Sequence, residues 1–256
     1  MPVQRLRNLT GRERSPESNW RLAGFLALIA GATDTGGYFS VKQYSSHMSG
    51  IVSATAVHSA LGDAALAAAG FASLLSFLMG ASCTAILVNW GRRRLLHSAY
   101  AAPLMLEAVL LTGFALAGAH LEHRYVFIPT AAILLCFTMG LQNAIITKIS
   151  NAEIRTTHVT GIVTDMGIEL GKLFYWNRSC ERLREPRVLA DRQKLALLTS
   201  LLVLFFGGGI LGVLGFRHLG FTFTLALAGI LVVLAAVPVL DDLRLSREKV
   251  TSTAAK

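Results

Sequence analysis

Two short polar motifs in an otherwise apolar sequence contain the residues best suited to chemistry. They are His47-Met48-Ser49-Gly50 and His158-Val159-Thr160-Gly161, which lie 111 positions apart. Histidine titrates near neutral pH, which suits proton transfer, and the neighbouring hydroxyl groups can donate and accept hydrogen bonds. Because the two motifs match, we expect their histidines to occupy equivalent positions in two halves of the chain.

The match between the two halves extends to both sides of the histidine motifs. Upstream, residues 31–34 align with residues 140–143 at an offset of 109, so that Asp34 corresponds to Asn143. Downstream, residues 73–81 align with residues 200–208. The pattern predicts an internal repeat, and a substrate site at its interface is expected to contain the following residues: Asp34, His47, Ser49, Gly50, Gln142, Asn143, Thr157, His158, Thr160 and Gly161.

Asp34 is expected deep inside an apolar segment that begins near Trp20. Fourteen helical residues span roughly 20 Å, and an ionised Asp at the centre of a bilayer costs about 2.5–3.5 kcal/mol. The residues that follow it, at positions 35–37, are Thr-Gly-Gly, which favour a break in the helix. Two interpretations stay open: a carboxylate that binds a proton, a cation or a solute, and a carboxylate that only caps a helix fragment.

Three further acids are candidates for binding a proton or a cation. Asp165 and Glu169 are four residues apart and share one helix face, with Lys172 three residues beyond, so an ion-paired face near the cytoplasm is the simpler interpretation. Glu107 lies a turn inside its segment from Pro103, close enough to the end for its side chain to reach the membrane interface.

The remaining chemistry-bearing residues do not form a recognisable catalytic set. No HxxH or CxxC spacing is present, and His47 and His58 would lie roughly 16 Å apart on one helix, too far to hold one metal ion. No nucleophile is paired with a recognisable base. We therefore expect no metal, no cofactor and no enzyme activity.

The composition places these residues in a membrane. Of the 256 residues, 53% are hydrophobic and only 15% are charged, whereas soluble domains carry about 25% charged residues. A soluble α/β enzyme, a disordered chain and a disulfide-stabilised secreted module are thereby excluded. The elements that must position the two motifs are therefore membrane helices.

Six stretches are long and apolar enough to cross a bilayer: about 20–40, 64–90, 101–119, 127–148, 195–216 and 220–240. Two others, at about 45–62 and 157–175, contain the histidine motifs and are too polar to face lipid. If only the six stretches cross, 21 of the 24 basic residues lie on one side, which the positive-inside rule identifies as cytoplasmic. Eight crossings would instead send Arg92, Arg93 and Arg94 outward.

The predicted fold is therefore an all-α, polytopic membrane bundle of six transmembrane helices with both termini in the cytoplasm. A basic tail (1–19) precedes the first repeat (20–120), and the second repeat (127–240) contains a basic loop (177–194) and is followed by a tail (241–256). Three crossings per repeat is an odd number, so the second repeat must be inverted. Each repeat then has one polar re-entrant or broken segment, and the two segments approach the midplane from opposite faces.

The motifs also resemble those of a known family. The relevant segments are residues 31–34, 46–50, 140–144 and 155–161, and together they are similar to the YoaK-like family of bacterial inner-membrane proteins. The chain differs from the usual pattern at Ser49, Ile51 and His158. The family is catalogued as a domain of unknown function, so the resemblance implies a six-helix inner-membrane protein and supplies no substrate.

The favoured function is a transporter or channel for a small solute or ion, with its polar site at the repeat interface. Two alternatives stay open: an intramembrane enzyme that uses His and Asp as acid and base, and a scaffold or accessory subunit whose polar groups only hold the bundle together. The expected partners are the lipid bilayer, anionic lipid headgroups at the basic loops, the solute itself and, as one possibility, further copies of the chain; nucleic acid is not expected.

Overall fold

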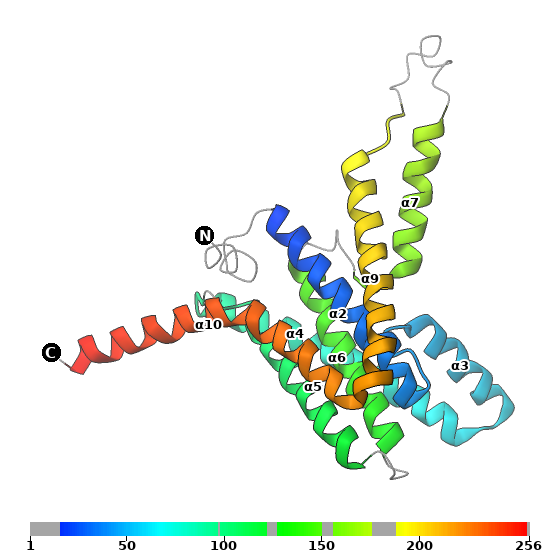
Figure 1. Cartoon of the computed structure of the whole chain (residues 1–256), viewed down its shortest axis with the longest axis horizontal. Coiled ribbons are helices and arrows are strands. Elements are labelled where there is room, and N and C mark those ends of the chain that lie inside the picture. Colours follow the sequence, from blue (N-terminus) through cyan, green and yellow to red (C-terminus); the bar gives the residue numbers. More distant parts are fainter. Residues whose placement is uncertain (1–15, 97, 122–126, 150–155, 176–187, 255–256) are drawn as a thin grey trace.

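The computed structural model describes residues 16–96, 98–121, 127–149, 156–175 and 188–254, and within these ranges every regular element is helical. The α-helices are α2 (Pro16–Val41), α3 (Met48–Leu61), α4 (Ala64–Arg93), α5 (Ala101–Leu121), α6 (Phe127–Ile149), α7 (Val159–Phe174), α9 (Arg192–Leu219) and α10 (Phe223–Ala254), with a 3-10 turn, η2 (Gly220–Thr222), between the last two. The long helices form a bundle from which α3 and α7 project in different directions (Figure 1). The all-α prediction is confirmed.

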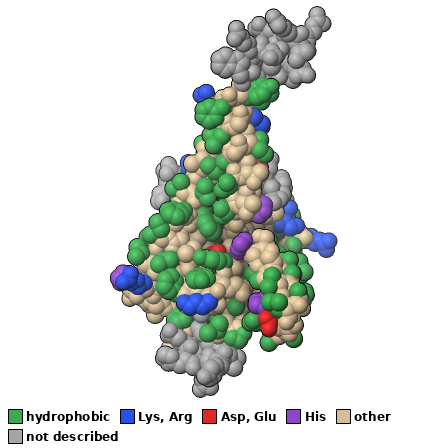
Figure 2. Space-filling view, turned by 90° about the vertical axis from the view of Figure 1, so that its right-hand side faces the viewer, with side chains coloured by type: hydrophobic (Ala, Val, Ile, Leu, Met, Phe, Trp, Pro, Cys, Tyr) green, Lys and Arg blue, Asp and Glu red, His purple; other side chains and the backbone are tan. Residues whose placement is uncertain are grey.

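Four helical stretches among the described residues are long and apolar enough to cross a membrane. They are Ala64–Arg93, Ala101–His120, Ile128–Ile149 and Arg192–Leu240, the last of which contains both α9 and α10. Helix α2 is not among them, because its second half carries the polar sequence at positions 33–37. Hydrophobic side chains cover much of the face shown in Figure 2. The apolar helices indicate that the chain lies in a lipid bilayer.

The most extensive helix contacts join α2 to α9 and α4 to α6. Gly24 of α2 lies against Leu204 of α9, and Gly36 lies against Phe216, so α2 and α9 run parallel. In the second pair, Ser76 of α4 donates a hydrogen bond to the carbonyl of Ile133 (2.7 Å), and Thr84 donates to Leu141 (2.9 Å). Helices α4 and α6 are therefore parallel as well.

The two pairs run in opposite directions. Gln142 of α6 donates to the carbonyl of Leu26 in the first half of α2, whereas Gly37 near the end of α2 lies against Leu135, which comes earlier in α6. Helix α2 is thus antiparallel to α6. Helix α5 packs antiparallel against α10, because Thr224 donates to the carbonyl of Leu111 and the backbone N–H of Ser98 donates to Asp242.

Glycines bring the backbones of each parallel pair into direct contact. A Cβ atom at any of four glycines would overlap a carbonyl oxygen of the facing helix, at Gly31 (Phe205), Gly208 (Leu28), Gly80 (Phe137) and Gly140 (Phe77). Small residues at such crossings allow close packing in the absence of a hydrophobic driving force between helices in lipid. Gly80 occupies the same place in the α4–α6 pair as Gly208 occupies in the α9–α2 pair, and the two glycines are 128 residues apart. The sequence alignment paired Gly80 with Gly207 and is therefore wrong by one residue.

The first residues of the polar segment at 45–62 lie beside the helix that precedes it. Asp34 lies seven residues before the end of α2, roughly 10 Å along its axis, yet it accepts a hydrogen bond from the backbone N–H of Ser46. The chain therefore reverses at Lys42 and returns beside α2 before α3 begins at Met48. In the same way, Thr157 donates to Asn143, six residues before the end of α6.

The predicted break in the first apolar segment is wrong in its position. Helix α2 continues through Asp34 and ends at Val41, where Lys42 adopts a left-handed φ of 54°. Gly36 and Gly37 do not end the helix, because they make room for Phe216 of α9 and Leu135 of α6. Tertiary packing here outweighs the low helix propensity of glycine.

The predicted terminal and loop regions are partly helical in the structure. The expected tail at 241–256 continues as helix to Ala254 in α10. Residues 16–19 of the expected basic tail already belong to α2, and residues 1–15 lie outside the described residues, as do residues 177–187 of the basic loop. The rest of that loop leads into α9, which Asp191 caps by accepting from the backbone N–H groups of Gln193 and Lys194.

Candidate functional site

Asp34 of α2 holds the segment before α3 by hydrogen bonds. Its Oδ1 accepts hydrogen bonds from the hydroxyl of Ser45 (3.1 Å) and the backbone N–H of Ser46 (2.8 Å), and its Oδ2 accepts from the hydroxyl of Ser46 (2.9 Å). The side chain is buried. These donors precede α3, so the carboxylate holds the returning chain and does not cap a helix fragment, and Asp34 also borders the cavity described below.

Asn143 makes the corresponding contact before α7. Its Oδ1 accepts a hydrogen bond of 2.5 Å from the hydroxyl of Thr157. The hydrogen bond from Thr157 to Asn143 therefore corresponds to the hydrogen bond from Ser46 to Asp34. An amide replaces the carboxylate, and one hydrogen bond replaces three.

The two histidines occupy the N-cap positions of α3 and α7 with nearly the same backbone conformation. His47 has φ −88° and ψ 70°, and His158 has φ −82° and ψ 64°. A Cβ at Gly50 or Gly161 would collide with the imidazole of the histidine three residues earlier. The shared His-x-x-Gly spacing thus has a physical cause: glycine leaves the space above the first helical turn into which the imidazole folds. Neither histidine side chain caps its helix by a hydrogen bond.

A cavity of about 770 Å³, here named the central cavity, joins the two motifs. Seven residues predicted for the site line it: Asp34, His47, Ser49, Asn143, Thr157, His158 and Thr160. Gly50 and Gly161 lie beneath the two histidines instead. The sequence prediction missed Phe77 and Phe205, which line the cavity from α4 and α9 at the offset of 128 that the glycine contacts define. The sequence alignment, at an offset of 127, paired Phe77 with Leu204 and so hid this correspondence.

Gln142 is also buried but does not line the cavity. Its Nε2 donates to the carbonyl of Leu26 (3.4 Å), while its Oε1 has no hydrogen-bond partner among the described residues. Thr33, which corresponds to Gln142 in the other half, likewise has a buried hydroxyl without a partner in that part of the chain. Gln142 thus serves to join α6 to α2.

Asp165 and Glu169 lie away from the central cavity and connect α7 to α9. Asp165 pairs with Lys194 of α9 at 3.3 Å, and Glu169 pairs with Lys172 at 2.9 Å. Glu169 also accepts from the backbone N–H of Asp191 at 2.8 Å. The hydrogen bonds from Lys172 and Asp191 lower the pKa of Glu169. The geometry fits the ion-paired helix face that was the simpler interpretation.

The lowered pKa of Glu169 predicts a loss of stability in acid. A carboxylate with a lower pKa in the folded state contributes stability above its unfolded pKa, near 4.3, and loses that contribution as the pH falls through its folded value. We expect the thermal stability of the detergent-purified protein to decrease between about pH 5 and pH 3, and to decrease less in Glu169→Gln. Asp63→Asn is the control, because that acid lies on the α3 side. Identical pH profiles for wild type and Glu169→Gln would contradict the prediction.

Glu107 does not reach the surface, so that part of its prediction is wrong. Its side chain is 1% exposed within α5, and its Oε2 has no hydrogen-bond partner among the described residues. It packs among the helices because α5 lies against both α6 and α10. It does not border the central cavity.

No group of three potential metal ligands among His, Cys, Asp and Glu occurs in the described part of the chain. Within the same residues, the central cavity is lined by hydroxyl, amide, imidazole, aromatic and carboxylate groups and by the apolar side chains of Met48 and Val159. Such a lining can accept and donate hydrogen bonds to a small polar solute.

Comparison with known proteins gives one match. The model of a family described as a protein of unknown function, DUF1275, matches residues 22–237. No curated protein and no solved structure gives a match. Both histidine motifs, Asp34, Asn143 and both pairs of contact glycines lie within the matched residues. The chain therefore belongs to the DUF1275 family, the YoaK-like family that its paired motifs resemble.

Proposed function

We propose that this protein carries a small solute or ion across the bacterial inner membrane through the central cavity. The observation that carries the proposal is that residues from both histidine motifs line one polar cavity of about 770 Å³. Polar side chains within a membrane bundle are costly and mark solute pathways when they surround a cavity. A solid interface would have favoured the scaffold alternative, in which polar groups only satisfy one another.

The proposed architecture has two inverted repeats, one formed by α2–α5 and the other by α6–α10. Its support is the correspondence between contacts: α2 packs on α9 as α6 packs on α4, and α3 packs on α4 as α7 packs on α9. The antiparallel directions of α2 and α6 agree with inversion. In this proposal the six long helices cross the membrane, α3 and α7 are half-helices of re-entrant segments, and both termini are cytoplasmic.

A transport assay tests the function directly. Proteoliposomes are mixed with hyperosmotic neutral, anionic or cationic solutes, and the rate of volume recovery is followed by light scattering. Wild type should admit at least one of these solutes faster than Ser49→Trp and Thr160→Trp, because each Trp fills part of the central cavity. Ser59→Trp is the matched control, since Ser59 is exposed near the far end of α3.

Two outcomes separate the test of transport from the test of the roles of Asp34 and His47. Equal rates for wild type and both cavity-filling variants with every solute would overturn the transport proposal. If the Trp variants are slow but Asp34→Asn and His47→Ala both transport at the wild-type rate, transport stands and these two side chains are excluded from its mechanism.

A further inference from the structure

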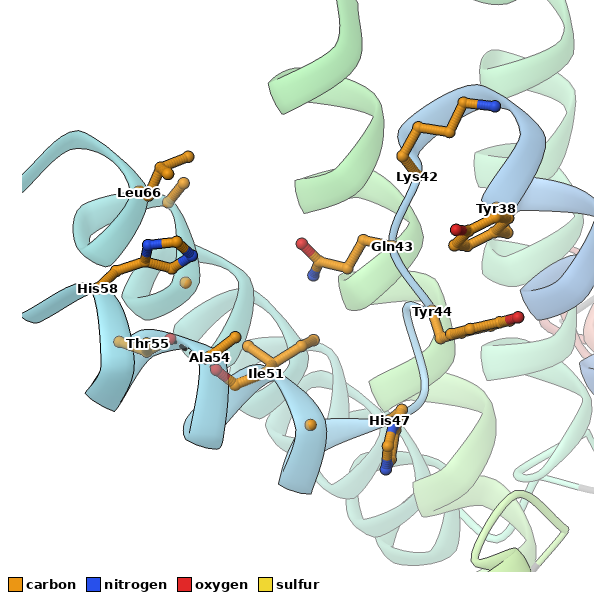
Figure 3. A pocket seen from close by; sticks show the side chains of 13 residues that line it. Tyr38, Lys42, Gln43, Tyr44, His47, Ile51, Ala54, Thr55, His58 and Leu66 are labelled. Atoms are coloured by element: carbon orange, nitrogen blue, oxygen red, sulfur yellow. Dashed lines mark hydrogen bonds between the residues drawn. The ribbon is translucent and has the colours of Figure 1, made fainter. Parts of the chain in front are cut away.

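A second, smaller cavity adjoins the central one. It has a volume of about 300 Å³ and lies between residues 42–47 and α3 (Figure 3). Tyr44 and His47 line both cavities. The Gln43 side chain, labelled in Figure 3, also lines this cavity and donates a hydrogen bond to Ser73 of α4 (3.4 Å). We name this space the Lys42 pocket, after the one lysine among its lining residues.

The Lys42 pocket is basic. Its ionisable nitrogen-bearing groups are Lys42, His47 and His58, and its described lining contains no carboxylate. The only acid in contact with these groups in the described residues is Asp63, whose Oδ2 lies 3.3 Å from Nδ1 of His58. The ammonium of Lys42 lies 5.9 Å from the ring centre of Tyr38 and 5.8 Å from that of Phe39, on the side of the returning chain away from α3 (Figure 3), and it forms no ion pair within that part of the chain.

Lys42 has a left-handed backbone conformation at the end of α2. Its φ of 54° is a left-handed conformation that glycine adopts at far lower cost than other residues. A lysine at this helix end therefore keeps a strained conformation where glycine would fit better. Leu95, after the end of α4, has a similar φ of 57°.

The lining of the central cavity suits a bound anion better than a bound cation. Asp34 is the only acid in its described lining, and both carboxylate oxygens already accept hydrogen bonds from Ser45 and Ser46. The first turns of α3 and α7 border the same cavity, at Ser49 and Thr160. The positive ends of half-helices oppose the passage of cations.

We propose that the solute is a small anion, which the Lys42 pocket collects and passes to the central cavity by way of Tyr44 and His47. The inference rests on the proposed function and adds the substrate class to it. Lysine supplies the charge that raises the local anion concentration, and its flexible stem allows the ammonium to move between the ring of Tyr38 and the pocket. The polar lining then replaces part of the hydration of the anion.

Charged thiol reagents test this selectivity without knowledge of the natural solute. In a background of Cys83→Ala, Cys136→Ala and Cys180→Ala, a single cysteine is introduced as Ser49→Cys in the central cavity. Anionic, cationic and neutral methanethiosulfonates of similar size are applied to proteoliposomes, and their reaction rates are measured. Ser59→Cys, on the exposed outer part of α3, gives the reference ratio.

We expect the anionic-to-cationic rate ratio to be on the order of tenfold higher at Ser49→Cys than at Ser59→Cys. Adding Lys42→Gln should bring the ratio at Ser49→Cys close to the reference. Arg217→Gln should leave it unchanged, because Arg217 is exposed at the corresponding end of the parallel helix α9 and lines neither cavity.

The outcomes separate the inference from the function on which it rests. Reaction with the neutral and cationic reagents, but no anionic preference, would overturn the anion inference and leave the transport proposal standing. Failure of all three reagents at Ser49→Cys and at a second cavity position, Thr160→Cys, would overturn both. A ratio that Lys42→Gln leaves unchanged would remove the Lys42 pocket from the pathway and so also contradict the inference.

Discussion

Gly208→Ala is expected to destabilise the protein severely, whereas Gly207→Ala, one residue away, should leave its stability unchanged or slightly increased. A Cβ at Gly208 would overlap the carbonyl of Leu28 on α2, and the collision is with backbone, which has no side-chain rotamer to adjust. Overpacking a tight contact costs about 1–3 kcal/mol, and this contact lies at the upper end of that range or beyond it.

Gly207 is a matched control for this substitution. A Cβ at Gly207 meets no atom within 4 Å, so alanine adds helix propensity, about 0.8–1 kcal/mol, and no collision. Thermal unfolding of the detergent-purified proteins, followed by loss of the monodisperse gel-filtration peak, measures both variants. Equal melting temperatures for the two would show that α2 and α9 do not cross at Gly208.

The same test extends to the other parallel pair. Gly80 and Gly140 make the equivalent backbone contacts between α4 and α6, whereas Gly113 of α5 has open space around it. We expect Gly80→Ala and Gly140→Ala to be as damaging as Gly208→Ala, and Gly113→Ala to be tolerated. If only one helix pair were sensitive, the correspondence of contacts on which the inverted-repeat proposal depends would lose its energetic basis.

The overall class of the fold could be predicted because composition and hydrophobic length depend only on local sequence. Long apolar runs predicted the positions of α4, α5 and α6 closely, and the two polar gaps correctly indicated segments distinct from the long helices. Boundaries were less predictable. Helix α2 continues past its Gly-Gly pair because residues far away in the sequence, Phe216 and Leu135, occupy the space that the glycines leave.

Part of the lining of the central cavity could also be predicted, because the two matched motifs supply a second copy of each signal. Position 49 and position 160 each carry a hydroxyl beside a matched histidine, and both line the central cavity. Phe77 and Phe205 could not be identified in the same way. Each belongs to an apolar run in which nothing in the local pattern distinguishes a cavity-lining aromatic from one that faces lipid.

The burial of Glu107 and the ion pair of Asp165 could not be predicted, because both depend on contacts with other helices. A carboxylate a turn inside a span reaches the interface only if no neighbouring helix covers it, and α5 is covered by both α6 and α10. The sequence pattern groups Asp165 with Lys172 on its own helix, yet its partner is Lys194 of α9. A partner on a separate helix has no fixed spacing that a sequence pattern could reveal.

Asp34→Ala is the second substitution with a large expected effect, because it removes the acceptor for three hydrogen bonds at once. The hydroxyls of Ser45 and Ser46 and the backbone N–H of Ser46 would lose their partner. Hydrogen bonds to charged groups contribute about 1.5–3 kcal/mol each, and a buried donor left without a partner adds its desolvation cost. We expect residues 42–47 to detach from α2, measured as faster backbone hydrogen exchange at residues 44–48.

Two variants determine whether the charge or the geometry of Asp34 matters. Asp34→Asn keeps one acceptor oxygen, so exchange at residues 44–48 should increase less than in Asp34→Ala. Asn143→Ala removes a single hydrogen bond, from Thr157, and should loosen the start of α7 to a smaller degree than Asp34→Ala loosens the start of α3. Equal exchange in all four proteins would mean that the carboxylate does not hold the returning chain. Asp34 would then be available to bind a solute, contrary to the role that its three hydrogen bonds assign to it.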